Sequence, residues 1–444
     1  MPDNSREILL EALLQVEENE GYSNLVLDKT LKKYSDLDKR DKALVSIIFY
    51  GVLEKKIALD YIISLYLKDK RLKLSRITEL ILETAVYQIF YLERVPDSAA
   101  VNCAVELAKI YKQKFSFINA VLRSIVTNKN SINFPEGDSP FALSIRYSIP
   151  EELINLWLLS YGKNITANLL EDFNKKASIF VRRNNTRISH DDFMRIAEEN
   201  LGLHPVGNYS AAYRISNTGI LTQNTFFDEG LYHVQDLSSQ LLCDIINPNE
   251  GEKVLDVCAA PGGKTFTLAE KMNNKGEIYS FDLYRGRVNL IRKGAERLGL
   301  NIVNPRMRDA ASDTDFIYEA DKVLCDVPCS GFGTIRRKPE IRYKSIKSIN
   351  SLPEIQYAIL LNSKRLVKIG GILIYSTCTL NKAENNAVAN RFLFENPDYV
   401  PYSINSDESV SITRTIDEPE NQLTMMPFST GTDGFFTAMF KRIR

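Results

Sequence analysis

The chain has 444 residues, of which 44% are hydrophobic and 25% charged, a composition typical of globular proteins with two or three domains. Its 56 basic residues balance its 56 acidic ones, so net charge indicates no class of partner, and any nucleic-acid surface must be a local patch. No apolar run reaches the ~20 residues of a membrane span, and the first residues lack the basic and apolar regions of a signal peptide. We therefore expect a cytoplasmic protein.

The cysteines limit the function further. None of them belongs to a Cys-x-x-Cys pair and no histidine stands beside one, so we expect no zinc or other metal site. A disulfide framework is equally unexpected in a long cytoplasmic chain. The cysteines are Cys103, Cys243, Cys258, Cys325, Cys329 and Cys378.

The first part of the chain is predicted to be helical throughout. Pro96 separates two apolar segments, and Asp97 and Ser98 follow it as candidate helix caps. We expect residues 1–130 to form a bundle of six or seven helices without catalytic groups, followed by a polar linker up to residue 140. Apolar residues recur at helical spacing in residues 6–16, 43–53, 57–67, 77–92, 99–111 and 115–126.

Two mixed patterns follow. Residues 141–230 predict a small α+β module, with strands at 179–182 and 213–215 and a helix at 190–201 that Ser189 caps. Residues 231–444 alternate between strands and helices, which predicts an α/β domain with a doubly wound parallel sheet. The aromatic segment 434–440 is expected to add an antiparallel edge strand. The alternating strands are expected at 254–257, 277–281, 322–325 and 371–375, and the helices at 238–246, 264–272, 285–298 and 355–367.

Residues 254–265 read VLDVCAAPGGKT, an apolar strand, a glycine turn and the start of a helix. A P-loop would need a glycine where Cys258 stands, and a nicotinamide site would need Gly-x-Gly-x-x-Gly. S-adenosylmethionine (SAM) remains as a ligand, because it requires a tight turn, helix N–H groups and an acid for its ribose. An ordinary strand–helix turn is the alternative. The predicted cradle consists of Cys258, Ala259, Ala260, Pro261, Gly262, Gly263 and Lys264.

Three aspartates stand at or after strand ends, where ligands bind in open α/β sheets. Asp282 lies about 20 residues beyond Gly263, the separation expected of a ribose-binding acid, although a helix N-cap is the alternative. Asp309 follows another short strand and is placed to meet an adenine amino group, although a loop aspartate is the simpler interpretation. Asp326 ends a third strand and begins the more specific stretch described next.

Two strand ends each present a cysteine. Cys329 lies in DVPCSG, beginning at Asp326, and Cys378 lies in STCT, beginning at Ser376. A carboxylate, a proline and a thiol at the ligand-facing edge are unusual for a hydrophobic core. The alternative is that both are small buried thiols, as most free cysteines are.

CAAPGGKT, DVPCSG and STCT, in this order, resemble the RNA 5-methylcytosine methyltransferases of the NOL1/NOP2/Sun family, and the match covers the C-terminal half. The helical region resembles the RNA-binding NusB domain, and the order of domains resembles members that act on 16S ribosomal RNA. The resemblance implies a Rossmann-like fold that holds SAM through the cradle and the three aspartates. It assigns attack on cytosine C6 to Cys378, product release to Cys329, and a hydrogen bond to the cytosine N3 edge to Asp326.

This sequence departs slightly from the family pattern, with Asp-Val-Pro-Cys for Asp-Ala-Pro-Cys and Thr-Cys-Thr for Thr-Cys-Ser. DNA cytosine methyltransferases attack with the Pro-Cys cysteine, so the residues alone leave the choice between Cys329 and Cys378 open. A free thiol has a pKa of about 8.5, so the attacking cysteine needs activation. No histidine in these motifs supplies it, and Lys264 is our candidate source of positive charge.

RNA is the expected partner, and the reactive cytosine must be unpaired or flipped out of its stack. We expect no membrane partner and a monomeric enzyme. Two groups of basic residues are candidate RNA surfaces, and the second of them consists of Arg182, Arg183 and Arg187. Transfer RNA as substrate, a non-catalytic RNA-binding scaffold and a dinucleotide-dependent oxidoreductase are the rival functions, the last disfavoured by the missing glycine pattern. The first candidate RNA surface comprises Arg336, Arg337, Lys338 and Arg342, with Lys344 nearby. We expect these side chains to contact RNA phosphates, and a solvated charged face is the alternative.

Overall fold

The computed structural model describes residues 4–18, 23–67, 69, 73–197, 202–207, 209–216, 221, 224–314, 319–404 and 414–444. The chain forms two compact units, Met1–Thr166 with Ile335–Lys344, and Ala167–Thr334 with Ser345–Arg444. The three functional domains predicted from the sequence stay a prediction, because compactness does not establish separate roles. None of the described helices has both the length and the apolar character needed to cross a membrane.

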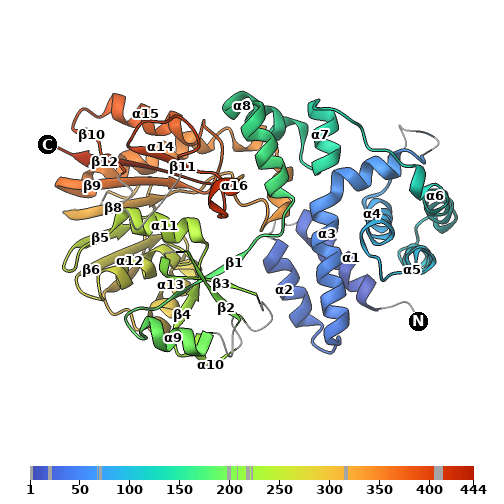
Figure 1. The fold of residues 1–444 in the computed structure, drawn as a ribbon, viewed down its shortest axis with the longest axis horizontal. Coiled ribbons are helices and arrows are strands. Elements are labelled where there is room, and N and C mark those ends of the chain that lie inside the picture. Colours follow the sequence, from blue (N-terminus) through green and yellow to red (C-terminus); the bar gives the residue numbers. More distant parts are fainter. Residues whose placement is uncertain are drawn as a thin grey trace. The chain divides into compact units, whose positions relative to one another are not determined.

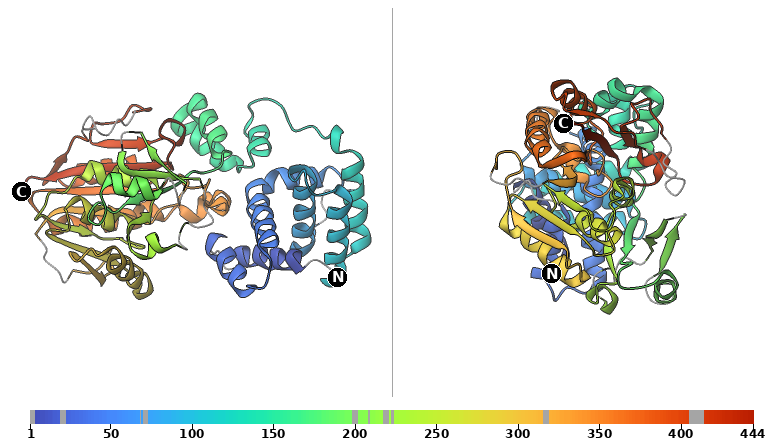
Figure 2. Two further views of the ribbon diagram at one scale, coloured as in Figure 1. Left: turned by 60° about the horizontal axis from the view of Figure 1, so that its bottom comes forward. Right: turned by 90° about the vertical axis from the view of Figure 1, so that its left-hand side faces the viewer.

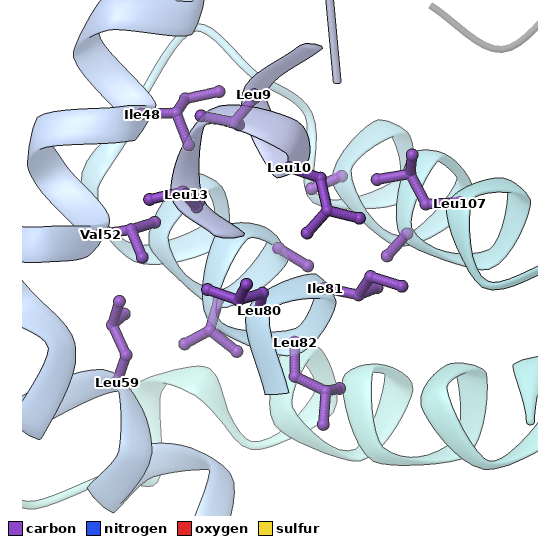
Figure 3. Packing of buried hydrophobic residues seen from close by; sticks show 14 of the residues in the cluster. Leu9, Leu10, Leu13, Ile48, Val52, Leu59, Leu80, Ile81, Leu82 and Leu107 are labelled. Carbon is purple, nitrogen blue, oxygen red and sulfur yellow. The ribbon is translucent and has the colours of Figure 1, made fainter. Parts of the chain in front are cut away.

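The first unit is a helical bundle, as the sequence predicts. Its core is formed by aliphatic side chains such as Leu13, Val52 and Leu80 (Figure 3). The helices expected at 43–53 and 57–67 form one continuous helix, because the intervening Glu and Lys residues favour helix. Pro96 occupies the N-cap position of the fifth helix, and none of the described side chains caps that helix. Asp97 and Ser98, the candidate caps, therefore do not cap it. Figure 1 labels α1 to α8, and Figure 2 shows the same ribbon from two other sides. The helices are α1 (Asn4–Glu18), α2 (Ser23–Lys33), α3 (Lys39–Ser64), α4 (Arg76–Tyr91), α5 (Asp97–Ile110), α6 (Phe115–Thr127), η1 (Lys129–Ser131), α7 (Pro140–Tyr147), the first part of α8 (Glu151–Phe173) and η4 (Pro339–Tyr343).

The second unit contains a small antiparallel sheet of order β2-β3-β1-β4. The sequence predicted β1 and β3 and missed the short strands β2 and β4. Ser189 caps the helix that follows β1, as expected, by accepting from the Asp192 N–H, whereas residues 198–201 of that predicted helix lie outside the described residues. The elements are β1 (Ile179–Arg183), α9 (His190–Ile196), β2 (Leu203–Val206), β3 (Tyr209–Ile215), α10 (Thr225–Asp228) and β4 (Tyr232–Val234).

The large sheet confirms the doubly wound α/β prediction. Strands β9, β8, β5, β6 and β7 are parallel neighbours, and apolar side chains alternate between two cores, one beneath α11, α12 and α13 and one beneath α14 and α15 (Figure 1). The aromatic C-terminal strand β12 is antiparallel to β9 but is not the edge, since β10 and β11 pair with its other side.

The elements of this domain are α11 (Leu237–Ile246), β5 (Lys253–Asp256), α12 (Gly263–Lys271), β6 (Glu277–Asp282), α13 (Arg285–Leu298), β7 (Val303–Met307), β8 (Ala320–Asp326), η5 (Ile346–Ile349), α14 (Leu352–Ser363), η6 (Lys364–Leu366), β9 (Val367–Thr377), α15 (Asn386–Glu395), β10 (Tyr399–Pro401), β11 (Gln422–Met425), α16 (Pro427–Thr430) and β12 (Phe435–Arg442).

A buried ion pair links β1 to α12. The Nε atom of Arg182 donates to Glu270 Oε2 at 2.8 Å, and the two side chains are 5% and 0% exposed. Arg183 is also buried, and Arg187 donates to the backbone carbonyl of Leu298 at the end of α13. We therefore replace the prediction that these arginines form a second RNA surface with a structural role, because their side chains hold elements of the second unit together.

We expect Arg182→Met to lower the free energy of unfolding by about 3–5 kcal/mol, because it leaves the Glu270 carboxylate buried without its partner. Arg292→Met on α13 is the control, because Arg292 makes an exposed hydrogen bond with Asn289. Urea denaturation measures the free energy of unfolding of both variants. Hydrogen exchange of β1 and α12 then shows whether the loss lies at this ion pair. A loss no larger than that of the control would contradict the structural role.

Candidate active site

The loop between β5 and α12 is held closely by backbone hydrogen bonds. Ala259 N donates to Phe281 O and Gly262 N donates to Ala259 O, both at 2.8 Å. Gly262 has a φ of +114°, and a Cβ atom there would lie 2.3 Å from the ring of Phe266. Only glycine fits this position. The predicted cradle thus takes the strand–turn–helix form that its sequence indicates.

Parallel pairing brings the candidate acids and thiols to one edge of the sheet. Asp326 ends β8 and is in register with Ser376 of β9, while Asp256 ends β5 beside β6, which ends at Asp282. Cys378 directly follows β9. Residues separated widely in the sequence therefore line one edge, with the thiols at one side and the acids expected to hold ribose and adenine at the other.

The two predicted catalytic thiols are in contact. The Sγ atoms of Cys329 and Cys378 lie 3.3 Å apart, and both residues are half-buried. The hydrogen bond with Cys378, together with burial, raises the pKa of Cys329 well above its usual range, and the charge of Glu384 adds to this effect. Cys329 is therefore a neutral thiol at pH 7, and the geometry allows it to share a proton with Cys378.

Lys264 carries a positive charge beside Asp326, near Cys378. Its Nζ atom lies 2.7 Å from Asp326 Oδ2 and 5.3 Å from the centroid of the Phe435 ring, while Asp326 Oδ1 accepts from Ser376 Oγ at 2.9 Å. Burial lowers the pKa of Lys264, but the Asp326 carboxylate outweighs burial and raises it above its usual range, with a contribution from Cys378. Lys264 therefore keeps its charge in a position that favours a Cys378 thiolate.

A cavity of about 210 Å³ adjoins this group. Asp256, on its wall, is buried, and burial raises its pKa to about 7; Thr265 and Lys264 oppose the shift, and Asp326 adds to it. Gln235 is 6% exposed, and its Nε2 atom has no hydrogen-bond partner among the described residues. The cavity is lined by Val234, Gln235, Ser239, Asp256, Ala259, Ala260, Pro261, Gly263, Lys264 and Asp326.

Asp282 and Asp309 each support a local turn. Asp282 is 5% exposed and its Oδ1 atom accepts from Tyr284 N at 3.2 Å. Asp309 accepts from Ala311 N at 2.9 Å and from Ser312 Oγ at 2.8 Å. Asp282 is not the N-cap of α13, because Tyr284 holds that position, whereas Asp309 has the loop role given as its alternative. The cofactor contacts of both residues stay predictions.

The basic segment after Cys329 belongs to the helical unit. Arg342 is 2% exposed and donates to the backbone carbonyls of Glu54 at 2.9 Å and Ser148 at 3.2 Å. Its predicted RNA contact is corrected to a structural role, because a buried guanidinium bonded to carbonyls cannot reach a phosphate. Arg336, Arg337 and Lys338 are half-buried, and their RNA contacts stay predictions.

Sequence reasoning missed Asp256, Gln235, Gln356 and Glu384. Asp256 stands within the motif that defined the cradle, so its place at a strand end could have identified it. Gln235 and Gln356 stand outside the recognised motifs, and Glu384 follows the second cysteine without a distinctive pattern. Only the three-dimensional structure brings these residues to the site.

Two family models match the chain, the 16S rRNA methyltransferase RsmB/F model over residues 243–441 and the NusB family model over residues 3–127. A protein of Bacillus subtilis strain 168, named probable ribosomal RNA small subunit methyltransferase B, is 36% identical, with 98% of each chain covered. The chain belongs to the RsmB/F family. A Synechocystis member of the same name is 33% identical, with 99% of each chain covered. The resemblance seen in the three motifs is thereby confirmed.

Solved structures show the same fold. The crystal structure of PH0851 superimposes with a TM-score of 0.82 at 26% identity and covers 100% of this chain and 99% of that one. NSun6 from Pyrococcus horikoshii, crystallised with SFG, gives a TM-score of 0.58 at 20% identity and covers 66% of this chain and 98% of that one. The likeness to PH0851 thus extends over both units of the chain.

We expect Lys264→Met to slow the alkylation of Cys378 by iodoacetamide at pH 7 about tenfold, because removal of the positive charge lowers the fraction of thiolate. The rate is measured by mass spectrometry in a Cys329→Ser background. Lys271→Met is the matched control, because Lys271 lies on the same helix and pairs with Asp244 at 3.1 Å instead. Equal rates for both variants would exclude Lys264 as the activating charge.

Proposed function

We propose that this RsmB/F family member is a SAM-dependent methyltransferase that forms 5-methylcytosine in 16S ribosomal RNA. The observation that carries the proposal is the contact between two thiols, Cys329 and Cys378, beside the Lys264–Asp326 ion pair. A pair of cysteines at the ends of neighbouring strands suits covalent catalysis on a pyrimidine, in which one thiol attacks and a second group assists release. The names of the curated relatives support small-subunit ribosomal RNA as the substrate.

The cavity lined by Lys264 and Asp326 fits SAM by its polar groups. The unpartnered Gln235 Nε2 is a donor that a ligand carboxylate would satisfy, and a buried donor without an acceptor is otherwise unfavourable. Asp256 on the same wall offers an acceptor to a cationic ligand. The predicted contacts of the cradle, Asp282 and Asp309 complete the proposed site. When bound, SAM supplies an electrophilic methyl group.

The two thiols and Asp326 account for the chemistry on cytosine. The Cys378 thiolate would add to C6, which moves the electrons of the C5–C6 double bond to C5. The C5 carbanion would then take the methyl group, and the electron pair of the broken C–S bond would stay on the donor sulfur, which leaves as a neutral thioether. A base removes the C5 proton, the double bond forms again, and the bond between Cys378 and C6 breaks with assistance from Cys329. We assign to Asp326, whose carboxylate is bonded to Lys264 and Ser376, a hydrogen bond to the N3 edge that would stabilise the adduct.

The surroundings of the two cysteines support attack by Cys378. The hydrogen bond with Cys378, together with burial, raises the pKa of Cys329. The charge of Lys264 acts on Cys378. This difference favours the RNA-family assignment of roles over the one used by DNA cytosine methyltransferases.

Recognition of RNA is assigned to the NusB-like helices and to Arg336, Arg337 and Lys338. Positive side chains fix the phosphate backbone, and the chemistry requires an unpaired or flipped base. A cytosine in a structured ribosomal RNA must therefore leave its stack to reach the thiols.

Covalent trapping tests the assignment of the thiols. With SAM and 16S ribosomal RNA, we expect Cys329→Ala to accumulate an RNA–protein adduct on denaturing gels, because attack proceeds and release does not. Cys378→Ala should give none. An adduct that requires Cys329 and survives loss of Cys378 would reverse the roles, and a wild-type protein that methylates transfer RNA but not 16S ribosomal RNA would refute the substrate.

The pH dependence of SAM binding tests the role of Asp256. The raised pKa, about 7, means that Asp256 is protonated below this pH and ionised above it. Because the ionised form attracts a cationic ligand, the affinity for SAM should fall below pH 7, by at most about tenfold per pH unit. Calorimetry on the wild type and Asp256→Asn separates this effect from titration of SAM itself. Identical pH profiles would exclude Asp256.

A further inference from the structure

A buried glutamate holds the loop that carries Cys329. Glu384 is 0% exposed and accepts from Ser330 N at 2.9 Å, from Ser330 Oγ at 2.5 Å and from Gln356 Nε2 at 2.9 Å. The same Gln356 Nε2 also donates to Pro328 O at 2.9 Å. The residues on both sides of Cys329 are therefore fixed by one hydrogen-bonded Glu384–Gln356 pair.

The next residue in the chain holds the other cysteine. Asn385 Oδ1 accepts from Thr377 Oγ1 at 2.6 Å, and Asn385 Nδ2 donates to Thr379 O at 2.9 Å. Thr377 and Thr379 flank Cys378. Asn385 occupies the N-cap position of α15, where an asparagine side chain ordinarily accepts from the helix N–H groups, yet it makes no capping bond. Its side chain is used to fix the Cys378 segment instead.

Packing alone does not explain a carboxylate in this position. Burial of a charge is strongly unfavourable unless hydrogen bonds compensate for it, and apolar side chains can hold a loop without that penalty. Glu384 is fully bonded, with Asn381 Nδ2 as a further donor at 2.9 Å. Its charge also adds to the hydrogen bond with Cys378 and to burial in raising the pKa of Cys329. Asn385, at the other thiol, is neutral.

We propose that Glu384 and Asn385 are positioning residues for different steps: Glu384, with Gln356, places Cys329 for product release, and Asn385 places Cys378 for attack. The inference rests on the function proposed above and deepens it. Because the two residues are adjacent in the chain, a single turn before α15 sets the spacing of the two thiols.

A single-turnover experiment with methyl-labelled SAM and 16S ribosomal RNA separates the two steps. Glu384→Gln, which keeps the shape and removes the charge, should form the adduct at the wild-type rate and release it about tenfold more slowly or worse. Asn385→Ala should slow adduct formation by about the same factor, without accumulation of the adduct. The full-length protein is used, and thermal unfolding and SAM affinity are measured for every variant.

Matched controls are Glu354→Gln, an exposed carboxylate on α14, and Asn390→Ala on α15, whose side chain bonds Gln422. Glu384→Asp and Asn385→Asp, which keep part of each hydrogen-bond set, should give intermediate rates and carry the test if the first variants unfold. Slowing of the same step by both substitutions, or wild-type rates in both, would overturn the division of roles. If the wild type itself forms neither adduct nor product, the proposed function fails together with this inference.

Discussion

The parallel alignment of β9, β8, β5 and β6 is the constraint on which the proposed site depends. Parallel strands direct their carboxyl ends to the same edge, so Cys378, Asp326, Asp256 and Asp282 converge although long helical connections separate them. The same arrangement places the start of α12 beside these residues. The hydrophobic cores on the two faces of the sheet fix this alignment, since a shift in register would move apolar side chains into the wrong layer.

The charges at this edge are limited by burial. Lys264 and Asp326 form a close ion pair, while burial favours the protonated form of Asp256, whose pKa is raised to about 7. The site can therefore hold one ion pair beside Asp256 without several unpaired buried charges, which would be strongly unfavourable. A thiolate formed there is most stable when a cation is close. Lys264 supplies one such cation, and a sulfonium ligand in the adjoining cavity would supply another.

Patterns local in sequence predicted most of the fold and the centre of the site. The helices of the bundle, the alternating strands and the cradle motif all depend on neighbouring residues, and most of these elements lie where the sequence predicts them. The misassigned arginines show the limit of such patterns. Arg182 and Arg342 resemble solvated charges in the sequence, but their partners, Glu270 and Glu54, lie 88 and 288 residues away. Glu384 was missed for the same reason, since Ser330 is 54 residues distant.

The contact between the thiols itself requires that their roles differ. Two thiolates 3.3 Å apart would repel each other by about 5 kcal/mol at an effective dielectric constant of about 20, so only one cysteine can be ionised at a time. The surroundings then decide which one it is. The positive charge of Lys264 favours a thiolate at Cys378. In the proposed mechanism this charge favours Cys378 as the attacking group, and the same proximity keeps Cys329 within reach for release.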